Sequence, residues 1–228
     1  MQWSQLSSGI YSISQAAALL EIPSSRLRGW VCGQSGAKGK PLIKAQIPRV
    51  DRNIALSFVN LIEAKFIAAF ASKGVSVLSM RYMAEEAERF LSDPHPFATD
   101  WMFQTDGKKI FVEATERAND PYLYDLKGHN FAIHSVLAHE FKDDVKFSAN
   151  GLAGAWFPRK KIAPAVMVSP KISFGAPALM SSGVPTEALY DAYIAEEKDA
   201  DTVARWFDLP AKEVRQAVAF EANLKSLH

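Results

Sequence analysis

A short basic segment near the start of the chain combines serines and arginines, at helical spacing, with lysines in the glycine-rich stretch that follows. An arginine guanidinium carries two parallel N–H donors that match the O6 and N7 acceptors of guanine, and lysine ammonium groups bind phosphates. This combination predicts contacts with double-stranded DNA. The predicted DNA-binding residues are Ser24, Ser25, Arg26, Arg28, Lys38, Lys40 and Lys44.

The two ends of the chain carry opposite net charge. Residues 1–52 hold seven basic and two acidic side chains, a net charge of +5, whereas residues 185–228 hold five basic and nine acidic ones, a net charge of −4. A basic surface attracts phosphates, and an acidic one suits a basic protein partner or a solvated surface. The charge pattern therefore favours nucleic-acid contacts at the N-terminal end.

Two short helices are expected to position the basic residues. Ser14 is a candidate N-cap for an alanine-rich helix that stops at Glu21-Ile22-Pro23, and Ser24 is a candidate N-cap for the next helix. The side chains expected to point inward from the second helix are Leu27 and Trp30 or Val31. Helix, tight turn and helix is the unit that places its second helix in the major groove.

A wing is expected after the second helix. Residues 33–41 are rich in glycine and predict a flexible loop, and residues 42–47 have the composition of a strand. The spacing of Gly33 to Lys40 does not fit a phosphate-binding P-loop, because five residues separate the glycine from Gly-Lys, and Pro41 follows where serine or threonine is needed.

Two longer helices should follow. Apolar residues at three-and-four spacing predict a helix over 57–73, closed by Gly74, and Ser76 is a candidate N-cap for the next one. The second of these helices has an apolar seam fit for packing on another helix, within the chain or across a homodimer. The seam residues are Val77, Met80, Ala84, Ala87 and Leu91.

Beyond residue 93 the sequence gives weaker indications of secondary structure. Residues 101–112 predict a β-hairpin that turns at Asp106-Gly107, and residues 114–164 give little indication of structure. Helices are then expected over 186–196, 201–207 and 210–227. Asp208-Leu209-Pro210 joins a short helix to a longer one, as Glu21-Ile22-Pro23 does near the start.

The sequence gives no argument for an enzyme. The histidines at 129, 134 and 139 recur every five residues beside Glu140, whereas helical metal ligands pair at i and i+4 and strand ligands at i and i+2. Two acidic clusters, over 85–88 and 143–144, are interpreted as solvated charges. Cys32, the single cysteine, is interpreted as a small core residue. We therefore expect no catalytic residues, no metal site and no cofactor.

Residues 14–30 resemble the winged helix-turn-helix of MerR-type regulators, including Trp30 near the end of the second helix. The similarity continues through 58–70 and 74–81, which match the two following helices of that family, joined at Gly-x-Ser. The effector cysteines and long dimerisation coil of MerR-type proteins are missing. This resemblance implies a DNA-binding domain without metal or drug sensing.

The C-terminal part resembles a small domain of unknown function, in which Gly-x-Pro precedes a helical end with the pattern Val-x-x-Ala-x-x-Phe-Glu. Gly175 and Pro177 match the first motif and residues 214–221 match the second. The Gly-Thr-Arg step usual after Gly-x-Pro is replaced by Met-Ser-Ser-Gly at 180–183. Chains that join both parts look like VapB-type antitoxins, which are encoded beside PIN-domain ribonuclease toxins.

The expected fold is mainly α with small β elements. It divides into a MerR-like winged helix-turn-helix domain at 1–92, a hairpin-containing connecting region at 93–164 and a C-terminal helical domain at 165–228. The resemblance implies a cytoplasmic antitoxin that neutralises a PIN-domain toxin and represses its own operon as a homodimer on double-stranded DNA. A stand-alone MerR-like regulator without a toxin is the alternative.

Overall fold

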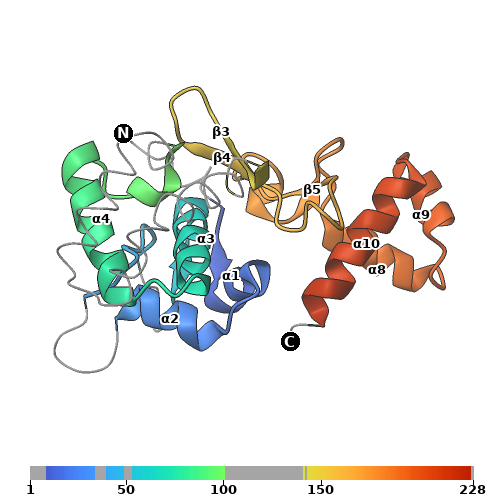
Figure 1. The fold of residues 1–228 in the computed structure, drawn as a ribbon. Coiled ribbons are helices and arrows are strands. Elements are labelled where there is room, and N and C mark those ends of the chain that lie inside the picture. Colours follow the sequence, from blue (N-terminus) through green and yellow to red (C-terminus); the bar gives the residue numbers. More distant parts are fainter. Residues whose placement is uncertain (1–8, 34–39, 49–52, 101–140, 142, 227–228) are drawn as a thin grey trace. The chain divides into compact units, whose positions relative to one another are not determined.

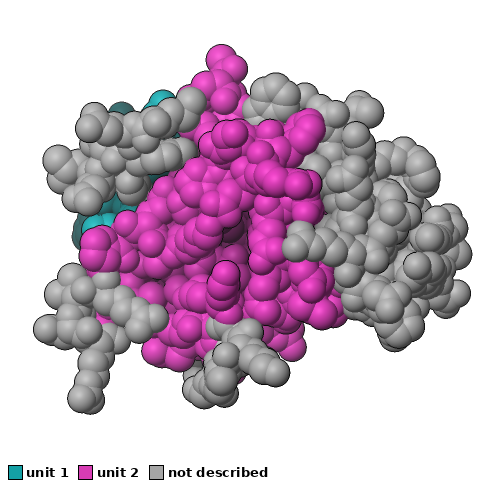
Figure 2. Space-filling model, turned by 90° about the vertical axis from the view of Figure 1, so that its left-hand side faces the viewer, with its two compact units in different colours: residues 1–10, 154–228 teal, residues 11–153 magenta. Residues whose placement is uncertain are grey.

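The computed structural model describes residues 9–33, 40–48, 53–100, 141 and 143–226. In this part of the chain the protein is mainly helical with short antiparallel strand pairs (Figure 1), which confirms the predicted class at that level. The chain divides into two compact units, residues 11–153 and residues 154–228 with 1–10 (Figure 2). The division falls inside the expected connecting region, and the predicted hairpin at 101–112 lies outside the described residues.

The described part of the unit of residues 11–153 packs around a buried helix, α3, of whose fifteen residues ten are buried. A helix buried on most sides lies at the centre of a core rather than at its edge. The described elements of this unit are β1 (Tyr11–Ser12), α1 (Ile13–Leu20), α2 (Ser24–Cys32), β2 (Ala55–Leu56), α3 (Phe58–Ser72), α4 (Val77–Leu91), the 3-10 turn η2 (Pro96–Ala98) and β3 (Val145–Phe147). Strands β1 and β2 pair antiparallel, with Tyr11 opposite Leu56.

An aromatic cluster fills the core beside α3. The Phe66 ring stacks on Phe70 and on Phe97, with ring centroids 4.5 and 4.4 Å apart, and meets Phe141 edge-on at 5.7 Å. Aromatic pairs in such geometries stabilise a fold beyond their buried area. The cluster ties the η2 turn and Phe141 to α3.

Serine N-caps start three of these helices. Ser57 and Ser76 cap α3 and α4 through bonds from the backbone N–H groups of Asn60 and Ser79, and for Ser76 this was expected from the sequence. The prediction for α1 was wrong, because Ser12 rather than Ser14 is its cap. The Ser12 hydroxyl accepts from the Gln15 N–H and the Gln15 side chain accepts from the Ser12 N–H, a reciprocal pair that Ser14 could not form from inside the helix.

The predicted apolar seam of α4 is only partly the face that the helix buries. Met80 and Ala87 are buried, but Val77 is 39% exposed, and the buried stripe passes instead through Ser79 and Met83. This stripe packs within the unit against α3 and η2. Met80 and Ala87 of the predicted seam therefore pack into the core of this unit, whereas Val77 is partly exposed to solvent.

The second unit ends in three helices that pack on one another. Its described elements are β4 (Ala153–Trp156), whose first residue belongs to the other unit, β5 (Val166–Met167), the 3-10 turn η5 (Ser173–Gly175), β6 (Ala178–Leu179), α8 (Thr186–Ala195), α9 (Ala200–Phe207) and α10 (Ala211–Lys225). Strands β5 and β6 pair antiparallel, and α10 packs against both strands and against α8 and α9. The three expected C-terminal helices are thus present, within about two residues of their predicted ends.

A buried carboxyl group holds α10 to the start of α8. The Thr186 hydroxyl donates to the Glu221 carboxylate at 2.5 Å, and burial raises the pKa of Glu221. The buried apolar residues Val214, Ala217 and Phe220 lie on the same helix. The second motif of the C-terminal resemblance, residues 214–221, therefore marks the buried face of α10. None of the helices among the described residues combines the length and apolar character needed to cross a bilayer.

Candidate nucleic-acid interface

The turn between α1 and α2 has a defined geometry. Glu21 adopts the left-handed conformation, with φ 56° and ψ 40°, and its N–H bonds to the carbonyl groups at the end of α1. The Ile22 N–H bonds to the Ala17 carbonyl at 3.0 Å, and Pro23 follows with φ −60° as the residue before α2. Because proline has a fixed φ and no N–H to satisfy, it suits the first residues of a helix. The expected helix, tight turn and helix is present.

Helix α2 buries one side and exposes the other to solvent. Leu27, Trp30 and Val31 are buried, which confirms the predicted inward face. The four predicted contact residues at the start of α2 are all exposed; they are Ser24, Ser25, Arg26 and Arg28. No side chain caps the N-terminus of this helix, whose partial positive charge favours an anion. The two serines and two arginines thus lie in the first five residues of α2, and its N-terminus has no side-chain cap.

The expected wing strand is not formed. Residues 42–47 contain no strand, because their backbone groups bond to other partners. The N–H groups of Leu42 and Ile43 both donate to the Trp30 carbonyl, at 2.8 and 3.1 Å. The Asn60 side chain accepts from the Gln46 N–H at 3.0 Å and donates to the Lys44 carbonyl at 2.9 Å. These contacts fold the segment back onto α2 and α3.

The three predicted lysines have different surroundings. Lys38 lies outside the described residues, and Lys40 is exposed while its carbonyl group accepts from Arg81 at 3.0 Å. Lys44 forms an ion pair with Glu88 of α4, with its ammonium group 2.5 and 2.6 Å from the two carboxylate oxygens. Exposed ion pairs contribute little stability, so a phosphate could compete with Glu88 for this lysine.

A cleft of about 690 Å³ separates residues 40–45 from α4. Its basic side chains, Lys40, Lys44 and Arg81, face two acidic ones, Glu85 and Glu88. The opposed charges within one cleft do not make a focused site for an anion. The lining also brings no nucleophile together with a base, which the chemistry of a hydrolase would need.

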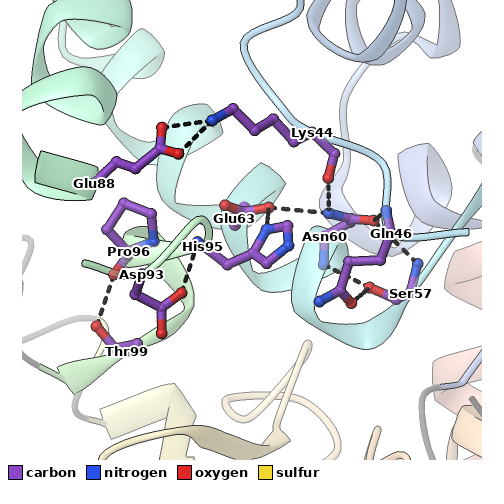
Figure 3. A network of polar contacts seen from close by, with 10 residues as sticks. All are labelled: Lys44, Gln46, Ser57, Asn60, Glu63, Glu88, Asp93, His95, Pro96 and Thr99. Carbon is purple, nitrogen blue, oxygen red and sulfur yellow. Dashed lines mark hydrogen bonds and ion pairs between the residues drawn. The ribbon is translucent and has the colours of Figure 1, made fainter. Parts of the chain in front are cut away.

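A buried polar network braces this unit (Figure 3). The Asn60 amide donates to the Glu63 carboxylate at 3.0 Å, and the same carboxylate oxygen lies 3.1 Å from Nδ1 of His95. The His95 N–H in turn donates to Asp93 at 2.8 Å. Desolvation raises the pKa of Glu63, although the contacts with His95 and Asn60 oppose the shift.

Sequence reasoning missed this network. Its members come from separate segments, and only the pairing of Ser57 with Asn60 three residues later is a local signal, that of a capping box. Asn60, Glu63 and His95 are each less than one-tenth exposed. A ligand would not reach groups buried in this way, so the network supports the fold and does not constitute a reaction site.

The remaining charged candidates form ion pairs, and the interpretation of residues 85–88 as solvated charges was wrong for Glu86, whose side chain is 11% exposed. Glu86 pairs with Arg89 and Asp144 lies 3.4 Å from Lys65. Cys32 is half-buried. Within the residues described, no group of histidine, cysteine and carboxylate side chains is arranged to hold a metal ion. The histidines at 129, 134 and 139 and Glu140 lie outside that part.

By its fold, the described part of the chain is that of a mainly helical protein with two compact units. It is similar to the solved X-ray structure of Rv2018 from Mycobacterium tuberculosis, with a TM-score of 0.71 and 20% sequence identity over 91% of this chain and 96% of that one. An identity this low establishes a shared fold and nothing about activity. Comparison with protein-family models and with curated proteins gave no match.

Proposed function

We propose that this protein is a DNA-binding antitoxin of a type II toxin–antitoxin system. In this proposal it neutralises a PIN-domain ribonuclease toxin, represses its own operon from a cytoplasmic location, has no catalytic activity of its own and needs no cofactor. The observation that carries the DNA-binding half is the exposed start of α2, where Arg26 and Arg28 stand beyond a tight turn of defined geometry. The toxin-binding half depends on the combination of the two resembling segments, the MerR-like one at the start and the C-terminal one, which together look like VapB-type antitoxins.

A homodimer is part of the proposal. Operators read by helix-turn-helix proteins commonly have two-fold symmetry, which a dimer matches. Three apolar side chains of α4 are available for such contacts, because Val77, Leu78 and Phe90 are 39%, 47% and 55% exposed. Met80 and Ala87 of the predicted seam are buried within the chain, so a dimer through α4 would use Val77 of the seam together with Leu78 and Phe90, which lie outside it.

Binding to duplex DNA should depend strongly on salt. The net charge of +5 on residues 1–52 implies that several phosphates are neutralised on binding, which releases counterions. A titration of labelled operator duplex by fluorescence anisotropy at about 50 and about 200 mM salt should show a loss of affinity of roughly tenfold or more. Absence of binding, or the same affinity at both salt concentrations, would contradict the DNA-binding half of the proposal.

DNA binding and toxin neutralisation should be separable. The variant in which Arg26, Arg28 and Lys40 are all replaced by alanine changes only exposed side chains, so each change should cost within about 0.5 kcal/mol of stability. We expect this variant to lose operator binding but still to protect cells that express the toxin encoded by the neighbouring gene.

Circular dichroism first verifies that the triple variant is folded. Loss of protection by the folded variant would show that one surface serves both partners. If the neighbouring genes encode no toxin, the protein is better explained as the stand-alone regulator.

A further inference from the structure

The ammonium group of Lys44 is held by a carboxylate from another helix. Lys44 lies in the segment 40–45 after α2, and its Nζ is 2.5 and 2.6 Å from the two carboxylate oxygens of Glu88 on α4. Both oxygens of Glu88 are therefore directed at one ammonium group (Figure 3). The positive charge that was predicted to contact a phosphate is thus neutralised within the chain.

The backbone around Lys44 is fixed independently of this ion pair. The side chain of the buried residue Asn60 donates to the Lys44 carbonyl at 2.9 Å and accepts from the Gln46 N–H at 3.0 Å. Two further N–H groups of the segment bond to the Trp30 carbonyl of α2, at 2.8 and 3.1 Å. A rotation of the Lys44 side chain is enough to break the ion pair, so the lysine can exchange its partner while the backbone stays in place.

Both partners of the ion pair are open to solvent. The side chain of Lys44 is 58% exposed and that of Glu88 is 39% exposed. Ion pairs with this exposure are weak, equivalent to about 1.4- to fivefold in an equilibrium constant. A DNA phosphate offers several acceptor oxygens and can reach Lys44 from the solvent. It can therefore displace Glu88.

The ion pair opposes DNA binding in two ways. Glu88 must release Lys44 before a phosphate can bind it, and the Glu88 carboxylate then remains near that phosphate and repels it. The salt dependence changes as well. A lysine that neutralises a phosphate releases a cation from the DNA, and this release makes the affinity fall as salt is raised. A liberated Glu88 carboxylate attracts a cation again, so the ion pair makes the salt dependence less steep.

We propose that Glu88 is an affinity-limiting residue for DNA binding: in the free protein it occupies Lys44, and in the complex a DNA phosphate displaces it. The inference rests on the DNA-binding half of the proposed function. It adds a residue of α4, a helix in which the sequence predicted no DNA contact. Because Lys44 is suited to a phosphate and not to a base edge, the restraint should act on operator and random duplexes alike.

Glu88→Gln in the full-length protein tests this inference, with a labelled duplex of random sequence as the probe. At about 50 mM salt the variant should bind the duplex roughly fivefold more tightly than the wild type, and from there to about 200 mM salt it should lose about threefold more affinity. Glu85→Gln is the matched control, because Glu85 lies one turn earlier on α4, lines the same cleft and carries the same charge. It should raise the affinity by about twofold at most, through the screened long-range effect of charge, and leave the salt dependence unchanged.

The double variant of Lys44→Ala with Glu88→Gln separates the ion pair from a general effect of charge. In the Lys44→Ala background, Glu88→Gln should raise the affinity no more than Glu85→Gln does. Equal gains from Glu88→Gln with and without Lys44, or equal gains from the two glutamate variants, would overturn the inference and leave the proposed function intact. If neither the wild type nor Glu88→Gln binds the duplex, the DNA-binding half of the proposed function fails, and the inference fails with it. Circular dichroism verifies that each variant is folded.

Discussion

Replacing Arg26 and Arg28 with alanine, one at a time, is expected to weaken binding to the operator by about 5- to 150-fold for whichever arginine reads a base edge. That range corresponds to about 1–3 kcal/mol for a lost bidentate contact with guanine. Both side chains are exposed in the first part of α2, which follows the turn at Glu21 and Pro23. Anisotropy titrations with operator and with random duplex measure the two affinities separately.

Lys40→Ala is the matched control for the arginine variants. Lys40 is exposed in the segment after α2 and is suited to a phosphate, so its loss should weaken binding to operator and random duplex alike and should make the salt dependence less steep. Equal effects of the arginine and lysine changes on both duplexes would show that α2 does not read bases. The DNA-binding half of the proposed function would then reduce to attraction between charges.

Asn60→Ala should destabilise the unit of residues 11–153 by about 2–4 kcal/mol. The Asn60 amide bonds to the Gln46 N–H, the Lys44 carbonyl and the Glu63 carboxylate, and its removal leaves a buried carboxylate with one donor fewer. Urea unfolding followed by circular dichroism gives the free energy of unfolding. Ser24→Ala, a change at an exposed serine, serves as the control and should have little effect.

The loss caused by Asn60→Ala should be larger at pH 8 than near pH 4.5, the ordinary pKa of this carboxyl group. Burial raises the pKa of Glu63 in the folded state, so the folded protein holds this proton more tightly than the unfolded chain does. Below the ordinary pKa the carboxyl group is protonated in both the folded and the unfolded state, so its titration does not change the free energy of unfolding. As pH rises above it, the unfolded state loses the proton first, and stability falls until the folded-state pKa is passed.

Glu63→Gln tests this sign directly. It removes the titrating group, so the variant should be at least as stable as the wild type at pH 8, and the difference should shrink as pH falls towards 4.5. The cost of Asn60→Ala should also be smaller in the Glu63→Gln background, because a neutral amide is less costly to bury than a carboxylate. If Asn60→Ala lowers the free energy of unfolding equally in both backgrounds, Asn60 stabilises the fold through its bonds to the backbone of Lys44 and Gln46 and not through Glu63.

The parts of the fold that follow from local rules were predicted from the sequence. Pro210 precedes α10 and Ser76 caps α4, as expected, because proline suits the start of a helix and the serine hydroxyl accepts from the first turn. The N-cap expected at Ser24 was wrong, because Ser24 is the first residue inside α2 and Pro23 precedes it. The exposed start of α2 follows from the helical spacing of Leu27 and Trp30, which fixes the side that must be buried.

Features that depend on distant partners were not predicted. Residues 42–47 have a strand's composition, but Asn60 and the Trp30 carbonyl take up backbone groups that a neighbouring strand would otherwise bond. The ion pair of Lys44 with Glu88 joins residues far apart in sequence. Similarly, no local pattern reveals that Glu63 and His95 meet in the core.

The turn at Glu21-Ile22-Pro23 recurs with the same left-handed first residue at Asp208-Leu209-Pro210, and this recurrence bears on how such a chain can change through evolution. In both places its geometry is set by a left-handed residue, an apolar residue and a proline, that is, by the backbone and not by the side chains on the exposed faces of the helices. Exposed residues of the helices on either side of the turn can therefore be substituted without changing the turn, and this holds independently for each of the two occurrences. Natural variants should accordingly retain Pro23 and Pro210 while the exposed side chains of the helices that follow vary in charge.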